Sequence, residues 1–335
     1  MQTKATLKEV AAIAGVSYQT VSKVLHGKMN VRQDTVEKIN AAINQLGYVP
    51  NQAARNLRST RSMAVGYTWQ PSDLPNSILE QFLQGMMNSA SEQGYQLVCF
   101  PSHNGLSAFD SIYASQKVDG FILSHIVNHD PRVLHLYQRK IPFVCFGDAG
   151  MKEVTSVDVD GAEGMRKIVR HLHEHGHDTV ALLAWRGESR VGDDRLRGFH
   201  EGMRECGIAV QPWLIRRGEG TVESGYLLTR ELLLTEMPSA IIAFNDLMAI
   251  GAIRAIRESG LIPGEDIAIT GYDDFPLAAY LSPSLTTIRQ PAWEIGQLVV
   301  KLLIDQIEGQ GEVLTGTRLF FPELITRESS SIYHR

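Results

Sequence analysis

The chain has few cysteines and no long apolar run among its 335 residues. Its three cysteines, Cys99, Cys145 and Cys206, lack the spacing of metal ligands and stand near apolar residues. We interpret them as buried thiols in a reducing compartment, which excludes a disulfide-rich secreted protein. The sequence begins with no secretory pattern, and no segment approaches the roughly 18 apolar residues of a membrane span. We therefore expect a cytoplasmic protein without a membrane partner.

Short motifs of several enzyme classes are also missing. The sequence has no nucleophile elbow, no Walker loop and no Gly-x-Gly-x-x-Gly turn. Asp273 and Asp274 are neighbouring carboxylates, but neighbours on an extended chain point to opposite sides. We expect neither an enzymatic activity nor a cofactor.

Histidines gather once, in the segment HLHEHGHD. His171 and His175 have metal-ligand spacing on a helix, with His173 and His177 nearby. The segment is expected to close an exposed helix, and no third ligand can be placed beside the pair. We expect no metal site there.

The net charge of −5 is unevenly distributed. Residues 1–60 contain eight Lys or Arg against three acids, which gives +5, so the remaining 275 residues carry −10. A small basic domain on an acidic body suits binding to DNA phosphates, although a solvated basic face would give the same sum.

The basic region opens with two short helical patterns. Thr6 and Glu9 form a capping box, after which apolar residues repeat at helical spacing until Gly15. Ser17 is a suitable N-cap for a second helix. A third apolar stripe, ended by Gly47, follows at Val36, Ile39, Ile43 and Leu46.

The second of these helices presents polar residues outward. Tyr18, Gln19, Ser22 and Lys23 lie opposite the apolar Val21. Gln can pair with an adenine edge and Lys can donate to guanine, so two helices with this turn indicate a helix-turn-helix. A small helical bundle with a polar face is the alternative.

Beyond residue 60 apolar strands alternate with helices in two series. Such alternation predicts parallel sheets covered on both faces, and two series predict two Rossmann-like lobes. The expected helices include 78–93, 194–206, 223–236 and 247–259, and the expected strands are 63–69, 95–101, 118–124, 141–147, 178–185, 239–245 and 266–273.

Polar residues follow several of these strands, where such lobes bind ligands. Asp160, Asn245 and Asp273 follow strands, and Arg195 lies near the start of a helix. Converging carboxylates, an amide and a guanidinium can hold sugar hydroxyls. Alternatively, Asp and Asn at strand ends form turns and N-caps, which we favour for Asp246.

Several motifs together resemble the LacI/GalR family of bacterial repressors over the full length of the chain. They are TLKEVAAIAGVSYQTVSKVL, LGYVPNQAARNL, DVDG, RLRGF, FNDLMAIGAIRAI and GYDDF. The resemblance implies an α/β protein with an N-terminal three-helix helix-turn-helix head and a two-lobed, Rossmann-like core of the periplasmic-binding-protein type. The implied domains are a head (1–50), a hinge helix and linker (51–61) and a core (62–335), whose N-lobe takes about 62–159 and 292–320 and whose C-lobe takes about 160–291 and 321–335.

The resemblance also implies DNA contacts in the head and the hinge. In the family a hinge helix pairs with its dimer mate and enters the minor groove, and Leu57 matches the residue that wedges the central base step. An ordinary linker residue is the alternative for Leu57. The implied contacts are Thr6, Ser17, Tyr18, Gln19, Thr20, Ser22, Lys23, Asn30, Asn51, Ala54 and Leu57.

Carried over from the family, the effector contacts are Asp160, Arg195, Asn245 and Asp273. An aromatic residue stacks on the sugar in some members, and the candidates here are Trp69, Trp185 and Phe275, each of which is equally plausible as a core residue. The chain ends without a heptad extension, so a homodimer is expected rather than a tetramer.

These features predict a dimeric transcriptional repressor. We expect it to bind a pseudo-palindromic operator, kinked at its centre, under the control of a sugar or sugar derivative held between the lobes. The alternatives are a sugar-binding receptor and a sugar-metabolising enzyme, neither with a DNA role.

Overall fold

The computed structural model describes residues 5–25, 31–48, 61–69, 77–101, 105–186, 189–310 and 314–330. The chain forms two compact units, Met1–Ser62 and Met63–Arg335. The contacts expected at Asn30, Asn51, Ala54 and Leu57, and the hinge helix expected from residue 51, lie outside the described residues.

The first unit contains the three expected helices: α1 (Leu7–Ala14), α2 (Tyr18–Leu25) and α3 (Gln33–Leu46). The capping box is formed, since Thr6 N–H donates to the Glu9 carboxylate over 2.6 Å and Glu9 N–H donates to Thr6 Oγ1. Val10, Val21, Ile39 and other apolar residues of the three helices form one small core. The stripes read from the sequence thus meet in a single packed head.

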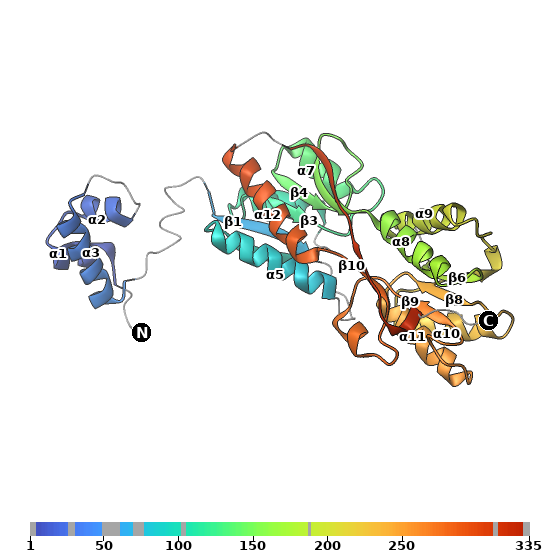
Figure 1. Ribbon diagram of the computed structural model, residues 1–335. Coiled ribbons are helices and arrows are strands. Elements are labelled where there is room, and N and C mark those ends of the chain that lie inside the picture. The colour runs from blue at the N-terminus through green and yellow to red at the C-terminus, as the bar shows by residue number, and fades with distance from the viewer. Residues whose placement is uncertain are drawn as a thin grey trace. The chain divides into compact units, whose positions relative to one another are not determined.

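The N-lobe of the second unit is built on a six-stranded sheet in the order β11-β5-β4-β3-β1-β2. In Figure 1 the helices α5 (Ser77–Glu92) and α12 (Ala292–Glu308) lie together beside this sheet. The other helices of the lobe are α6 (Leu106–Ala114) and α7 (Pro131–Arg139). All strand pairs are parallel, and the strands are β1 (Ala64–Trp69), β2 (Gln96–Pro101), β3 (Phe121–Leu123), β4 (Phe143–Phe146), β5 (Thr155–Val159) and β11 (Gly316–Phe320).

Both faces of this sheet are buried. Ile122 and Val144 pack in the cluster that contains α5 and α12, whereas their strand neighbours Phe121 and Cys145 pack in the cluster that contains α6 and α7. This alternation follows from the two-residue period of a strand. A sheet covered on both faces opens to ligands at the ends of its strands.

The C-lobe has a four-stranded parallel sheet in the order β7-β6-β8-β9. The pair α8 (Gly161–Glu174) and α9 (Arg190–Glu205) lies on one side of it in Figure 1, and α10 (Val222–Leu233) and α11 (Asp246–Glu258) lie on the other. At Gly198 a Cβ would come within 2.2 Å of the Ala162 carbonyl oxygen, so glycine there allows α8 and α9 to touch. The strands are β6 (Val180–Trp185), β7 (Ile215–Gly218), β8 (Ala240–Ala243) and β9 (Ala268–Thr270).

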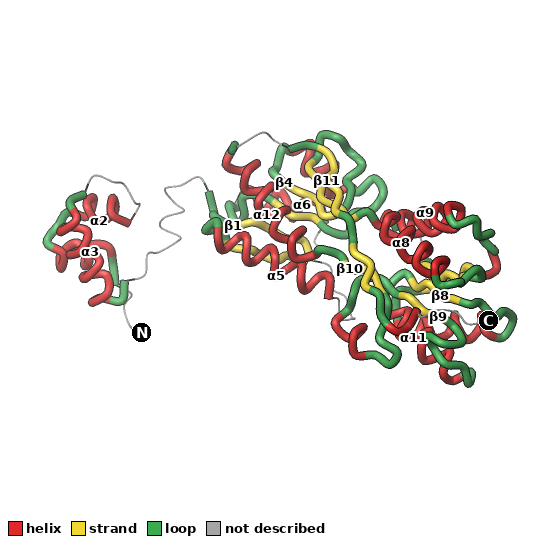
Figure 2. The backbone as a smooth tube through the Cα atoms, viewed as in Figure 1, coloured by secondary structure: helices red, strands yellow, loops and turns green. Residues whose placement is uncertain are grey.

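The chain passes between the lobes three times. It leaves the N-lobe between β5 and α8, returns between β10 (Thr287–Arg289) and α12, and leaves again between β11 and β12 (Glu323–Ile325). Strands β10 and β12 pair antiparallel at this crossing, where Figure 2 shows them running from one lobe into the other. Short 3-10 helices complete the lobe at Pro212–Leu214, Pro276–Tyr280 and Glu328–Ser330.

Three sequence expectations need correction. Only Cys145 is buried; Cys99 is exposed on the sheet-edge strand β2, and Cys206 is half-buried. Helix α9 begins at Arg190 instead of Asp194, because the Ser189 side chain accepts a hydrogen bond from Gly192 N–H and caps it there. His171 is not on an exposed helix but is buried, and its Nε2 lies 2.8 Å from Ser330 Oγ.

No helix in the described part of the chain is long and apolar enough to cross a membrane.

Candidate functional site

A cavity of about 380 Å³ lies between the strand ends of the two lobes. This volume falls in the range of small-molecule sites, which is about 300–1,000 Å³. Its walls come from α5 and the ends of β1, β3, β4 and β5 in the N-lobe, and from β6, α9 and the segment after β9 in the C-lobe. We call this cavity the cleft.

Arg195 and Asp273 form the charged centre of the C-lobe wall. Arg195 is 3% exposed, and its Nη2 donates to Asp273 Oδ1 over 3.0 Å. Its Nη1 donates to the Phe244 carbonyl, and the guanidinium lies 3.6 Å from the ring centre of Tyr272 and 4.9 Å from that of Trp185. Charge pairing and aromatic packing together hold the guanidinium in one place.

Asp273 faces the cleft with one free oxygen. Its Oδ1 also accepts from Gln290 Nε2 at 2.7 Å, while Oδ2 has no hydrogen-bond partner among the described residues. Burial raises the pKa of Asp273 above its usual value, and the adjacent Arg195 opposes that shift. The backbone φ of 110° is rare for a residue with a side chain, and such strain is common at ligand sites.

Asp246 holds the segment that carries Asp273. Its buried carboxylate accepts from Thr287 Oγ1 and from Phe275 N–H, both at 2.6 Å. Burial raises the pKa of Asp246 well above its usual value. The sequence favoured a turn or N-cap role for Asp246, but Asn245 is the N-cap of α11 and Asp246 is its first residue.

Two buried donors in this wall lack partners among the described residues. They are Arg195 Nε and Trp185 Nε1. Unsatisfied buried polar atoms are rare in proteins and call for a reason, and a ligand site is a common one.

The N-lobe wall has two acidic residues, Asp148 and Asp158. Asp148 N–H donates to Asp158 Oδ2 over 2.9 Å. Burial, aided by the charges of Asp194 and Asp148, raises the pKa of Asp158 to about 6. Burial also acts to raise the pKa of Asp148, but hydrogen bonds from Gly150 and Thr317, together with Arg190, hold it below its usual value.

Aromatic rings form the apolar part of the N-lobe wall. The Phe82 ring centre lies 4.7 Å from that of Phe146 and 5.8 Å from that of Tyr67. The Tyr67 hydroxyl lies 2.8 Å from Ser124 Oγ, which in turn lies 3.1 Å from His125 Nδ1. Burial, with the Arg132 charge acting in the same direction, lowers the pKa of His125, so this ring is neutral at pH 7.

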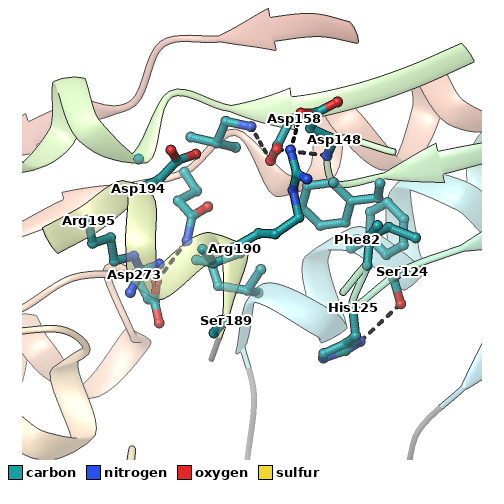
Figure 3. A pocket seen from close by; sticks show the side chains of 18 of the residues that line it. Phe82, Ser124, His125, Asp148, Asp158, Ser189, Arg190, Asp194, Arg195 and Asp273 are labelled. Atoms are coloured by element: carbon teal, nitrogen blue, oxygen red, sulfur yellow. Dashed lines mark hydrogen bonds and ion pairs between the residues drawn. The ribbon is translucent and has the colours of Figure 1, made fainter. Parts of the chain in front are cut away.

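Arg190 connects the two walls. It starts α9 in the C-lobe, and its Nη2 pairs with Asp148 of the N-lobe. Its Nη1 also donates to Asn128 Oδ1 over 3.3 Å. Figure 3 shows this side chain extending from beside Ser189 toward Asp148 and Asp158.

Of the expected effector residues, the structure brings Arg195 and Asp273 to the cleft. Asp160 and Asn245 are not among its described lining residues, because both cap helices: Asp160 accepts from Glu163 N–H at 2.8 Å, and Asn245 accepts from Met248 N–H at 2.9 Å. Trp69 and Phe275 do not line it either, whereas Trp185 does.

Sequence analysis missed most of the N-lobe wall. Ser124, His125, Asp148 and Asp158 line the cleft, as do Asp194 and Arg190 of the C-lobe. The signal was present for three of them, since Ser124 and His125 follow β3 and Asp148 follows β4 closely. Applying the strand-end rule to the first lobe would have found these three.

The head presents a polar surface on α2. Tyr18, Gln19 and Lys23 are exposed there, while Val21 is buried under the helix. Ser17 caps the helix, with its Oγ accepting from Thr20 N–H at 3.1 Å and lying 2.8 Å from Thr20 Oγ1. Ser22 is half-buried on the same helix.

Comparisons with known proteins assign both units. Residues 6–51 match a model described as bacterial regulatory proteins, lacI family, and residues 169–330 match a periplasmic binding protein-like domain. The HTH-type transcriptional regulator CelR of Thermobifida fusca is 34% identical over 316 residues, which cover 91% of this chain and 92% of the relative.

Two solved structures extend the likeness. The lac repressor dimer bound to operator and the anti-inducer ONPF superimposes with a TM-score of 0.86 at 31% identity, covering 98% of this chain and 100% of that one. A transcriptional regulator CelR-cellobiose complex gives a TM-score of 0.74 at 31% identity, with 97% and 100% covered. The predicted architecture of a helix-turn-helix head and a periplasmic-binding-protein-like core is confirmed. The chain belongs to the LacI family of bacterial regulatory proteins.

Proposed function

We propose that this protein is a sequence-specific repressor whose operator affinity is controlled by a sugar-like molecule bound in the cleft. The observation that carries the proposal is the Arg195–Asp273 pair, placed at a cavity between two lobes in a chain that also has a helix-turn-helix head. In this proposal the protein acts in the cytoplasm, as a homodimer, and without enzymatic activity.

In the head, the exposed side chains of α2 supply the base contacts. Gln19 suits an adenine edge, Lys23 suits guanine as a single donor, and Tyr18 adds a hydroxyl and a ring. The remaining proposed contacts position the head on DNA or act at the hinge, and they are Thr6, Ser17, Thr20, Ser22, Asn30, Asn51, Ala54 and Leu57. Leu57 is the proposed wedge at the operator centre.

In the core, the cleft supplies the ligand contacts. The free Oδ2 of Asp273 accepts a hydrogen bond from a ligand hydroxyl, and the guanidinium of Arg195 fixes that carboxylate in place. The similarity to a regulator solved with cellobiose supports a sugar as the ligand class. Asp160 and Asn245 remain proposed contacts only for an arrangement in which their helix caps are released.

Control of operator binding requires that the ligand bind the two lobe arrangements unequally. A ligand that contacts Asp148 and Asp273 touches both lobes at once, so its affinity depends on how far apart they lie. The angle between the lobes would then set how the hinges of a dimer pair.

The test is binding to a labelled pseudo-palindromic operator with a central CG step, with and without a panel of unphosphorylated and phosphorylated sugars. We expect specific binding that one compound shifts. Gln19→Ala should weaken operator binding about tenfold, since a good bidentate base contact contributes about 1–3 kcal/mol.

Asp273→Ala is the companion variant, and it should abolish the ligand response while operator affinity stays within twofold. If the unmodified protein binds no such DNA with or without ligand, the repressor proposal fails. A sugar bound without any DNA binding would instead favour a receptor.

A further inference from the structure

We propose that the cleft selects an uncharged, polyhydroxylated ligand and discriminates against its phosphorylated counterpart. The inference rests on the proposed role of the cleft as the ligand site. It narrows the ligand class by charge, which the sequence analysis left open.

The first argument for this selectivity is the charge of the side chains that line the cleft. Among the described lining residues there are four carboxylates, on Asp148, Asp158, Asp194 and Asp273, and two guanidiniums, on Arg190 and Arg195. The His125 ring adds no charge near pH 7, because burial lowers its pKa. The wall is therefore net negative around a ligand, and a phosphate group with a charge of about −1.5 to −2 is repelled.

Both guanidiniums are already paired with carboxylates, although Arg195 Nε has no hydrogen-bond partner among the described residues. Arg190 pairs with Asp148, and Arg195 pairs with Asp273 over 3.0 Å while also donating to a carbonyl. A phosphate would have to separate one of these pairs and leave a carboxylate unpaired beside it. Each new contact between the phosphate and a guanidinium would therefore leave one carboxylate without its cation, which costs free energy.

Helix N-termini are the usual alternative for binding a phosphate, and α5, α8 and α9 begin at the cleft. The N-termini of α8 and α9 are capped from within the chain, since Asp160 accepts from Glu163 N–H in α8 and Ser189 accepts from Gly192 N–H in α9. The cap on α8 is itself an anion, so these two ends offer little to a second anion. At the start of α5 the described lining side chains are the apolar Ile78, Leu79 and Phe82, which favour a carbon skeleton over a phosphate.

Hydroxyl groups match the polar atoms that remain free, because a hydroxyl can donate to the free carboxylate oxygens and can also accept from the unpartnered donors Arg195 Nε and Trp185 Nε1. Asp273 Oδ2 has no partner among the described residues, and neither has Asp194 Oδ2, whose sister oxygen accepts from Arg197 at 2.8 Å. Ionised carboxylates only accept, so they need a ligand with donors, which a hydroxyl has and an ionised phosphate lacks. The rings of Phe82 and Phe146 leave an apolar wall for the carbon skeleton.

The test is isothermal titration of the full-length protein with matched pairs: ribose and ribose 5-phosphate, glucose and glucose 6-phosphate, galactose and galactose 6-phosphate, and cellobiose and its 6′-phosphate. We expect at least one neutral sugar to bind and its phosphate to bind at least tenfold more weakly. A phosphate that binds as tightly as its neutral partner overturns the inference, and so does a panel in which no neutral sugar binds.

A charge-removing variant separates electrostatics from shape. Asp194→Asn keeps the size of the side chain, and it should raise the affinity for the phosphate severalfold relative to the neutral sugar. Asp193→Asn is the matched control, because Asp193 is exposed on the same helix and is not among the lining residues. In Asp193→Asn the ratio of the affinity for the phosphate to the affinity for the neutral sugar should stay within twofold of its value in the unmodified protein. Equal changes of this ratio in both variants would contradict the inference.

Operator binding is measured separately on the same protein. Loss of operator binding with intact charge discrimination would reject the repressor function and leave this inference standing. Specific operator binding that responds only to a phosphorylated sugar would support the repressor function and reject this inference.

Discussion

The two walls of the cleft are built differently. The N-lobe wall is largely aromatic, with Tyr67, Phe82 and Phe146 packed together, and its Asp158 carboxylate accepts a hydrogen bond from the backbone N–H of Asp148. The C-lobe wall is largely charged, with Arg195 fixed against Asp273. The cleft therefore has one apolar wall and one polar wall.

The two walls also differ in how they contribute to the stability of the core. Burying the aromatic wall stabilises the N-lobe directly, whereas the charged wall costs desolvation that its pairing offsets. A substitution on the N-lobe wall should thus act mainly on stability, and one on the C-lobe wall mainly on the ligand.

The largest effect on ligand affinity is expected for Arg195→Ala. It leaves Asp273 without its cation in a buried site, so ligand affinity should fall at least about 100-fold and the free energy of unfolding of the core by about 3 kcal/mol. Titration calorimetry and denaturant unfolding measure the two effects. Arg197→Ala, on the exposed side of the same helix, should cost less than about 1 kcal/mol. Similar losses in both variants would mean that the buried pair has no special role.

Phe82→Ala tests the other wall. The side chain is 1% exposed, and its removal should lower the free energy of unfolding of the core by about 3–4 kcal/mol because it leaves a cavity. Tryptophan fluorescence reports on the core alone, since Trp69, Trp185, Trp213 and Trp293 all lie within it. Ligand affinity should fall less than in Arg195→Ala. If Phe82→Ala lowered ligand affinity more than Arg195→Ala, the aromatic wall and not the charged wall would be the main determinant of ligand binding.

The contact between the walls is tested by a double-mutant cycle on Arg190→Ala and Asp148→Asn. Both side chains are about one-third exposed, so their coupling in the free energy of unfolding should be only about 0.5–1 kcal/mol. Because the pair joins the lobes, its loss should change the apparent ligand affinity more than stability. A coupling energy of zero in both measurements would show that the pair does not hold the lobes together.

A pH dependence of stability is expected from Asp158, of about the same size as that coupling energy. Its folded pKa of about 6 exceeds the usual value of 3.8, so the folded state binds this proton more tightly and stability falls as pH rises through 6. Asp158→Asn removes this dependence, and the stability of the variant relative to the natural protein should rise by about 1 kcal/mol between pH 5 and pH 7. Denaturant unfolding at the two pH values measures it, and a constant difference would show that Asp158 titrates normally.

Two of the residues expected at the site from sequence, Arg195 and Asp273, line the cleft. The strand-end rule led to Asp273, and family resemblance added the role of Arg195. The same rule pointed to Asp160 and Asn245, but each made a local bond to a backbone N–H three residues ahead and became a helix cap. At a strand-to-helix junction, capping and ligand binding compete for the same side chain.

The sequence by itself determined the head and the alternation of strands and helices in the core. Capping boxes, left-handed glycines and apolar periodicity act over three to seven residues, so their consequences are legible along the chain. Only the tertiary structure decided which side chains share the cleft. Arg190 meets Asp148, and Arg195 meets Asp273, across long separations in sequence. These contacts depend on the three crossings of the chain between the lobes and on how closely the helices pack. No local sequence pattern encodes either feature.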